Sequence, residues 1–171
     1  WLLEQSRKCW AREGRNYTYP QIEEMFRSEI DFASTVDPDD PRFANPDNMA
    51  EAIKEYCREH GNPVPANDAQ MISCILHSLA AKYLDVIKAL QSMASFNIDK
   101  LHIIGGGSAN KTMCQLTADT IGMPVIAGPA EATAIGNAMI QAQAARLYKD
   151  RWEMRAAVAR TIGTVTYMPQ K

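Results

Sequence analysis

The sequence predicts a helix-rich α/β fold with a few parallel strands, and three features predict it. Apolar residues recur at three- and four-residue spacing in several long segments, as in amphipathic helices that face a core. Two short apolar runs, 101–104 and 124–127, each lead into glycine. Helical spacing resumes after both runs, so strand, glycine turn and helix occur twice in succession, which is typical of a parallel sheet.

Two helices are expected before residue 34. Residues 1–13 carry apolar side chains on one face, and Gly14 is a typical helix end. Pro20 suits the first turn of a second helix, whose apolar face fades near Ala33. The segment 34–48 that follows is rich in proline and aspartate, which favour turns. We expect it to be a surface loop without regular structure.

Two further helices have clear start signals. Asn48, followed three residues later by glutamate, is expected to cap a helix that ends at Gly61. Asn67 is expected to open the longest helix, in which apolar residues recur at steps of three and four from Ile72 to Leu90. A second apolar row on this helix favours packing on a sheet over a coiled-coil partner.

The second half of the chain alternates between strands and helices. The run 101–104 is expected to be a buried parallel strand, followed by a helix over 108–121. The run 124–127 predicts a second strand, and about 130–148 predicts a helix with alanine at every fourth position. That small face permits close approach of another element, although the high helix propensity of alanine also explains it. Residues 149–171 predict a short helix and an extended segment, whose placement stays open.

Composition argues against several classes of protein. The 171 residues suit one domain, which can bury a core without disulfides or a metal. A formal charge of -2 offers no field for a nucleic acid, and no apolar run approaches the ~18 to 20 residues that span a bilayer. The four cysteines lack a paired motif, so we interpret them as buried thiols in the reducing cytoplasm. The histidines are isolated, and no metal site is expected.

Three successive glycines, Gly105, Gly106 and Gly107, form a candidate ligand site. They follow a predicted strand and precede a helix, where backbone can approach a flat or charged ligand beside helix amides. A turn needed only for strand-to-helix geometry explains them equally well. A Walker A loop and a dinucleotide-binding fingerprint both require glycine at the position of Asn110, so neither motif is present.

Four stretches of the sequence resemble the carboxy-terminal part of the FGGY family of carbohydrate kinases. They are 37–43 with Asn45 and Pro46, 101–110 continuing into 115–119, 124–129 and 131–137. The second and fourth stretches mark the whole superfamily, and the first and third are typical of one branch. The resemblance implies that 1–171 is the carboxy-terminal part of a nucleotide-binding lobe with the actin-like ATPase (ribonuclease H-like) fold, and that the first strands of this lobe are absent.

The resemblance also implies a site. In such kinases the glycine motif binds adenosine, so Gly106 and Asn110 are expected to contact the adenine and ribose of ATP or ADP, while Gly105, Gly107 and Ser108 shape the turn. The catalytic aspartate, the sugar contacts and the turns that hold phosphates and Mg²⁺ belong to other parts of the kinase. We therefore assign no catalytic or metal-binding residue to this chain.

The chain alone is expected to be inactive, and to associate with itself or with the remainder of the kinase. It is expected to bind neither nucleic acid nor a membrane, and to meet the sugar only through the missing lobe. Two alternatives stay open. One is an actin-like nucleotide-binding or regulatory module without sugar kinase activity, and the other is a purely structural domain in which the glycines only turn the chain.

Overall fold

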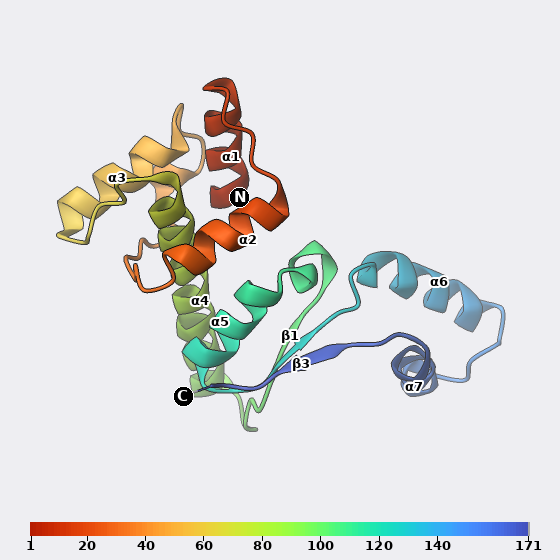
Figure 1. Ribbon diagram of the computed structural model, residues 1–171. Helices are drawn as coiled ribbons and strands as arrows, with labels where there is room; N and C mark the ends of the chain where they lie inside the picture. The colour runs from red at the N-terminus through yellow and green to blue at the C-terminus, as the bar shows by residue number, and fades with distance from the viewer. Residues whose placement is uncertain (171) are drawn as a thin grey trace. The chain divides into compact units, whose positions relative to one another are not determined.

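The computed structural model describes residues 1–170 and shows a helical unit followed by an α/β unit (Figure 1). The two compact units are Trp1–Ala94 and Ser95–Lys171. The length alone suggested a single domain, whereas the described residues divide into these two compact units.

Four α-helices and one short 3₁₀ turn make up the first unit. They are α1 (Leu2–Arg12), α2 (Tyr19–Ser28), the 3₁₀ turn η1 (Pro41–Phe43), α3 (Met49–His60) and α4 (Asp68–Met93). Helix α4 packs against α2 and α1, and α1 packs against α3. The largest fully buried side chains of this core include Trp10, Phe26, Phe43, Met49, Ile53 and Ile72.

Local signals placed the starts of α3 and α4 correctly. The side-chain oxygen of Asn48 accepts a hydrogen bond from the backbone N–H of Glu51 at 3.2 Å, and that of Asn67 accepts one from Gln70 at 2.9 Å. Gly61 ends α3 in the left-handed conformation, with φ of 69°. These caps satisfy helix-end amide groups that would otherwise lack a partner.

The expected end of the second helix is wrong. Helix α2 stops at Ser28 and does not continue to Ala33. Beyond its end, the carbonyl of Phe32 accepts a hydrogen bond from the hydroxyl of Ser73 on α4 at 3.0 Å. The chain thus leaves the helix because α4 supplies partners for its backbone.

Within the first unit, the neighbours of α4 are the helices α2 and α1. Ile72 and Ile75, in the amino-terminal half of α4, are fully buried. Tyr83, Val86 and Leu90, in the carboxy-terminal half, are 38%, 46% and 48% exposed. The helices of this unit therefore cover only the first half of the apolar stripe.

The segment 34–48 is more ordered than a surface loop. It contains η1, which Asp40 caps by accepting from the backbone N–H of Arg42 at 2.9 Å. Val36 and Phe43 are buried, at 5% and 1% exposed. The prolines and aspartates thus shape turns between anchoring apolar side chains.

The second unit holds a three-stranded mixed sheet. Its elements are β1 (Leu101–Ile103), the 3₁₀ turn η2 (Gly105–Ala109), α5 (Lys111–Ile121), β2 (Val125–Ala127), α6 (Ala132–Ala144), α7 (Arg151–Thr161) and β3 (Val165–Tyr167). The strand order is β1-β2-β3, with β1 parallel and β3 antiparallel to β2. Helix α5 packs on β2 and β3 (Figure 1). The antiparallel strand corrects the expectation of parallel strands alone.

The alternation of strand, helix, strand and helix is confirmed, with corrections to β1 and α5. Strand β1 is not buried, because it lies at the edge of the sheet with β2 as its one neighbour there. His102 is exposed, and Ile104, just beyond the strand, is 58% exposed. Helix α5 begins at Lys111 rather than Ser108, because the glycines form η2 first.

Helix α6 is shorter than expected and open to solvent. It spans Ala132–Ala144 rather than 130–148, and none of its residues is buried. Ala134 and Ala138 of the alanine row are exposed, and so is Gly136. The helix and extended segment expected in the tail are present as α7 and β3.

Candidate functional site

The glycine turn, defined here as residues 105–110, is held at its first residue by the turn that follows β2. Gly105 has φ of +72°, a left-handed conformation that favours glycine. Its backbone N–H donates to the carbonyl of Pro129 at 3.1 Å. The N–H of Gly128 donates in turn to the carbonyl of Ile103 at 2.8 Å. The turns that follow β1 and β2 are therefore hydrogen-bonded to each other.

Asn110 fixes the last residue of the glycine turn. Its side-chain oxygen accepts from the backbone N–H of Met113 at 2.9 Å and so caps α5. Its own N–H donates to the carbonyl of Gly107 at 3.2 Å. The side-chain nitrogen of Asn110, which carries two N–H donors, donates to no other described residue.

Strand-to-helix geometry does not explain the glycine at position 106. It is exposed, its φ lies outside the left-handed region, and an added Cβ would meet no atom within 4 Å. An added Cβ on Gly107 would lie 3.7 Å from Ile103, an ordinary contact. Conformation accounts for glycine at 105, whereas the protein's own packing places no such demand at 106.

Two polar side chains support the turn from within. The hydroxyl of Ser108 donates to the carbonyl of Gly105 at 2.7 Å. The buried thiol of Cys114 lies 3.9 Å from the carbonyl oxygen of Gly107 and 4.0 Å from that of Ser108. Burial raises the pKa of Cys114. A neutral thiol can donate to these carbonyl oxygens, so the carbonyl groups of Gly107 and Ser108 have a donor within the protein.

The five predicted site residues, Gly105, Gly106, Gly107, Ser108 and Asn110, thus lie together in one turn. The sequence did not indicate the contribution of Pro129 or of Cys114. Pro129 contributes its backbone carbonyl, which no side-chain pattern reveals, and a single cysteine in a helix is an ordinary core residue. All four cysteines are buried free thiols, as expected.

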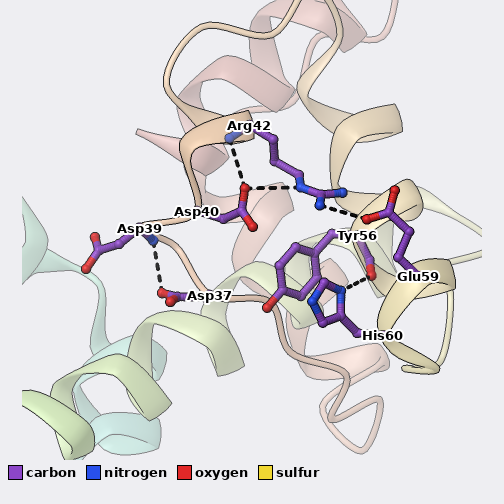
Figure 2. Close-up of polar contacts among 7 residues, drawn as sticks. All are labelled: Asp37, Asp39, Asp40, Arg42, Tyr56, Glu59 and His60. Atoms are coloured by element: carbon purple, nitrogen blue, oxygen red, sulfur yellow. Dashed lines mark hydrogen bonds and ion pairs between the residues drawn. The ribbon is translucent and has the colours of Figure 1, made fainter.

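The aspartate-rich loop 37–43 is held by ionic contacts to α3 (Figure 2). The guanidinium of Arg42 donates to Asp40 at 3.1 Å and to Glu59 at 2.7 Å, and it lies 5.1 Å from the ring centroid of Tyr56. The backbone N–H of Arg42, and then its guanidinium, lower the pKa of Asp40, and the guanidinium lowers the pKa of Glu59. Tyr56 stacks on His60 with ring centroids 3.9 Å apart.

The remaining aspartates of this loop pair with α4. The ammonium group of Lys82 lies 2.8 Å from a carboxylate oxygen of Asp37 and 2.8 Å from one of Asp39. Lys82 lowers the pKa of Asp37, mainly through this hydrogen bond. The acids of the loop therefore already have cationic partners, and no group of three potential metal ligands occurs within residues 1–170.

A cavity of about 570 Å³ lies in the first unit, apart from the glycine turn. It is lined by the end of α1 and the starts of α3 and α4, with Trp10 and Lys54 among its residues. Arg15 forms an ion pair with Asp68, and the hydroxyl of Tyr17 donates to the same carboxylate at 2.8 Å. No local sequence pattern indicates this cavity, because its lining residues come from several separate segments.

Comparison with known proteins assigns the chain to a family. Residues 1–145 match the C-terminal domain of the FGGY family of carbohydrate kinases. The chain belongs to the FGGY family. This match includes the glycine turn and α6, and it ends before α7 and β3.

Several relatives carry the name rhamnulokinase. The one from Bacteroides thetaiotaomicron is 45% identical over 170 residues, which is 99% of this chain and 34% of that protein. Those from Pectobacterium carotovorum and Bacillus subtilis are 42% and 37% identical, again over 99% of this chain and 34% of each relative. The chain thus spans about a third of these relatives' length. The branch that the first and third stretches indicated is the rhamnulokinase branch.

No helix of the described residues combines the length and the apolar character needed to cross a membrane.

Proposed function

We propose that this chain is the adenosine-binding part of an ATP-dependent sugar kinase that phosphorylates L-rhamnulose to L-rhamnulose 1-phosphate. Membership of the FGGY family and the rhamnulokinase relatives support the reaction class and the sugar. The observation that carries the proposal is the open backbone at Gly106, in the same turn as the side-chain N–H groups of Asn110, which have no acceptor among the described residues.

The residues of the glycine turn fit the nucleoside half of ATP or ADP. A purine is flat, and an exposed glycine backbone lets it approach more closely than any side chain would. The side-chain nitrogen of Asn110 can donate to an acceptor on the base or ribose while its oxygen continues to cap α5. In this proposal Gly106 and Asn110 contact the nucleotide, and Gly105, Gly107 and Ser108 hold the shape of the turn.

The phosphoryl chemistry of this proposal lies elsewhere in the kinase. ATP supplies the phosphoryl group, and its transfer depends on positioning and charge stabilisation around the terminal phosphate. No residue of this chain is assigned as catalytic base, as Mg²⁺ ligand or as sugar contact. The isolated chain is therefore expected to be inactive, with closure against the amino-terminal lobe completing the site.

The proposed fold of the complete lobe is the actin-like ATPase fold, with 1–171 as its carboxy-terminal part in a cytoplasmic enzyme. Two open features agree with missing neighbours: the free edge of β1 and the exposed apolar second half of α4. We expect self-association of the isolated chain, or binding to the remainder of the kinase. A single monomeric species in sedimentation velocity at micromolar concentration would contradict the expected self-association.

The nucleotide site is tested by titrating ADP into the chain and three variants. Gly106→Ala should weaken binding about tenfold, because the new methyl group separates the purine from the backbone. Asn110→Ser should also weaken binding, since serine keeps the helix cap but lacks the amide donor. Gly136→Ala is the matched control, because it too adds a methyl group at an exposed glycine with no neighbour within 4 Å. Equal affinity in all four proteins, or no ADP binding, would refute the site.

The kinase activity is tested by completing the chain. The amino-terminal two thirds of the Bacteroides relative, joined to this chain, should give ATP turnover that depends on L-rhamnulose, and the chain alone should give none. Turnover by the isolated chain would contradict its proposed incompleteness. A chimera that binds ADP but turns over no sugar would favour an actin-like nucleotide-binding or regulatory module.

A further inference from the structure

The last described residues of the chain, 163–170, contact both supports of the glycine turn. The first support is α5, which Asn110 caps, and the second is the turn at Gly128 and Pro129, which binds the N–H of Gly105. Residues 146–170 lie outside the match to the FGGY C-terminal domain, although the rhamnulokinase relatives align with 99% of the chain. The FGGY assignment therefore gives this segment no role.

The tail contacts α5 through two hydrogen bonds, and a third links the two α5 side chains that make them. The side-chain nitrogen of Gln115 donates to the carbonyl of Met168 at 2.8 Å and to a carboxylate oxygen of Asp119 at 2.8 Å. The same Asp119 oxygen accepts from the backbone N–H of Gln170 at 2.7 Å. The two side chains stand one turn apart on α5, so they tie the middle and the end of the helix to the tail.

The contact with the second support is a close approach of backbone. Gly128 has φ of +108°, and a Cβ there would lie 3.6 Å from the carbonyl oxygen of Gly163 and 3.7 Å from Thr164. Strand β3 then continues antiparallel to β2, with Val165 opposite Ala127. The tail thus contacts the chain immediately after β2. This is the segment in which the carbonyl of Pro129 accepts the hydrogen bond from Gly105.

We infer that residues 163–170 form a brace that fixes the position of the glycine turn, with Gln115 and Asp119 as positioning residues. Helix α5 would transmit a displacement from the tail to the glycine turn. Asp119 lies nine residues after Asn110, about 14 Å along the helix at 1.5 Å per residue. A tilt of about 5° at the end of α5 would move Asn110 by about 1 Å. The expected effect of the brace on ADP binding rests on the proposed function, whereas the coupling between the tail and the glycine turn does not.

Amide hydrogen exchange tests the brace without any ligand. Asp119→Ala removes the shared acceptor and should raise exchange at residues 105–110 about three- to tenfold, the effect of losing one ordinary hydrogen bond. Asp119→Asn keeps an acceptor oxygen and should restore slow exchange. Thr120→Ala is the matched control, because it removes a side-chain bond within α5, from Thr120 to the carbonyl of Leu116, and touches no tail residue.

A second variant tests the same contact of the tail with α5. Should Asp119→Ala fail to fold, Gln115→Met, which keeps the length of the side chain without its donor, should give the same faster exchange at the turn. Unchanged exchange at residues 105–110 in the folded variants, or an equal change in Thr120→Ala, would overturn the brace.

The consequence for nucleotide binding is measured separately. Asp119→Ala should weaken ADP binding about three- to tenfold, and Asp119→Asn should bind like the unmodified chain. If exchange responds as expected but no variant binds ADP, the proposed function fails and the brace stands. If ADP binds equally to all variants while exchange at the turn is unchanged, the brace fails and the proposed function stands.

Discussion

The helical unit and the α/β unit bury their side chains to different degrees. In the first unit Trp10, Phe26 and Phe43 are almost completely enclosed, whereas the largest fully buried side chains of the second unit are Thr117 and Val125. Helix α6 of the second unit has no buried residue. The glycine turn thus belongs to the unit with the smaller core. The larger part of the buried core therefore lies in the first unit, and the proposed nucleotide binding lies in the second.

The largest expected effect comes from the core of the first unit. Phe26 is fully buried, and Phe26→Ala should destabilise this unit by about 3–5 kcal/mol through lost burial and an unfilled cavity. Denaturant unfolding followed by tryptophan emission measures this loss. Trp10 is buried, whereas Trp1 and Trp152 are exposed, so the emission shift reports mainly the first unit.

The same variant tests whether the two units are independent. Amide exchange in β2 and α5 should be unchanged in Phe26→Ala. Faster exchange there by a similar factor would contradict the separation of stability from the glycine turn.

The second expected effect distinguishes two glycines within the α/β unit. Gly128→Ala should destabilise this unit by about 1–3 kcal/mol, because φ of +108° strains any residue with a side chain. Gly106→Ala should change stability by less than about 0.5 kcal/mol, since its surroundings are open. Amide exchange in β2 measures both. Equal losses would mean that Gly106 is a structural glycine, as in the alternative without a ligand.

Helix caps give a smaller effect. Asn67→Ala should cost about 1 kcal/mol by leaving the N–H of Gln70 without its acceptor, and Asn67→Ser should restore most of it. Asn110→Ala should cost a similar amount in the second unit. Thermal unfolding of the three variants checks this. A loss in Asn67→Ser as large as that in Asn67→Ala would show that the cap is not the cause.

These caps also show what the sequence can predict. Asn48 and Asn67 lie within three residues of the groups that they bind, so a local pattern indicates them. The direction of β3 was not predictable, because its partner β2 lies about forty residues earlier and no local signal sets their pairing. The exposed edge at β1 and the early end of α2 likewise depend on distant neighbours.

The candidate site, too, could be predicted only in part from the sequence. The three glycines and Asn110 stand out in the sequence, and they do form one turn. The other contacts join residues far apart in the sequence: the carbonyl of Pro129 accepts from the N–H of Gly105, and the side chains of Gln115 and Asp119 bind the backbone of the tail. Side-chain patterns carry little information about such contacts, so only the folded chain reveals them.

The smallest expected effect is the pH dependence of the first unit. Arg42 lowers the pKa of Asp40 and Glu59, so the folded state binds fewer protons than the unfolded state near their ordinary pKa values of about 4. The stabilisation is therefore present above that pH and is lost as the pH falls through the lowered values. Arg42→Gln keeps the backbone N–H that is the main cause at Asp40 but removes the guanidinium that lowers the pKa of Glu59, so it should partly flatten this dependence in denaturant unfolding at low salt. The ordinary carboxyl pKa of about 4 lies between pH 3 and pH 5. If the free energy of unfolding of Arg42→Gln depends on pH over this range as steeply as that of the unmodified chain, the prediction is contradicted.

The most direct test of the account is the amide exchange footprint of ADP on the unmodified chain. We predict slower exchange at residues 105–113, the glycine turn and the first turn of α5, with no change at residues 48–54 and 66–71 around the cavity of the helical unit. Protection around that cavity, with none at the glycine turn, would contradict the claim that the open backbone after β1 binds the nucleotide.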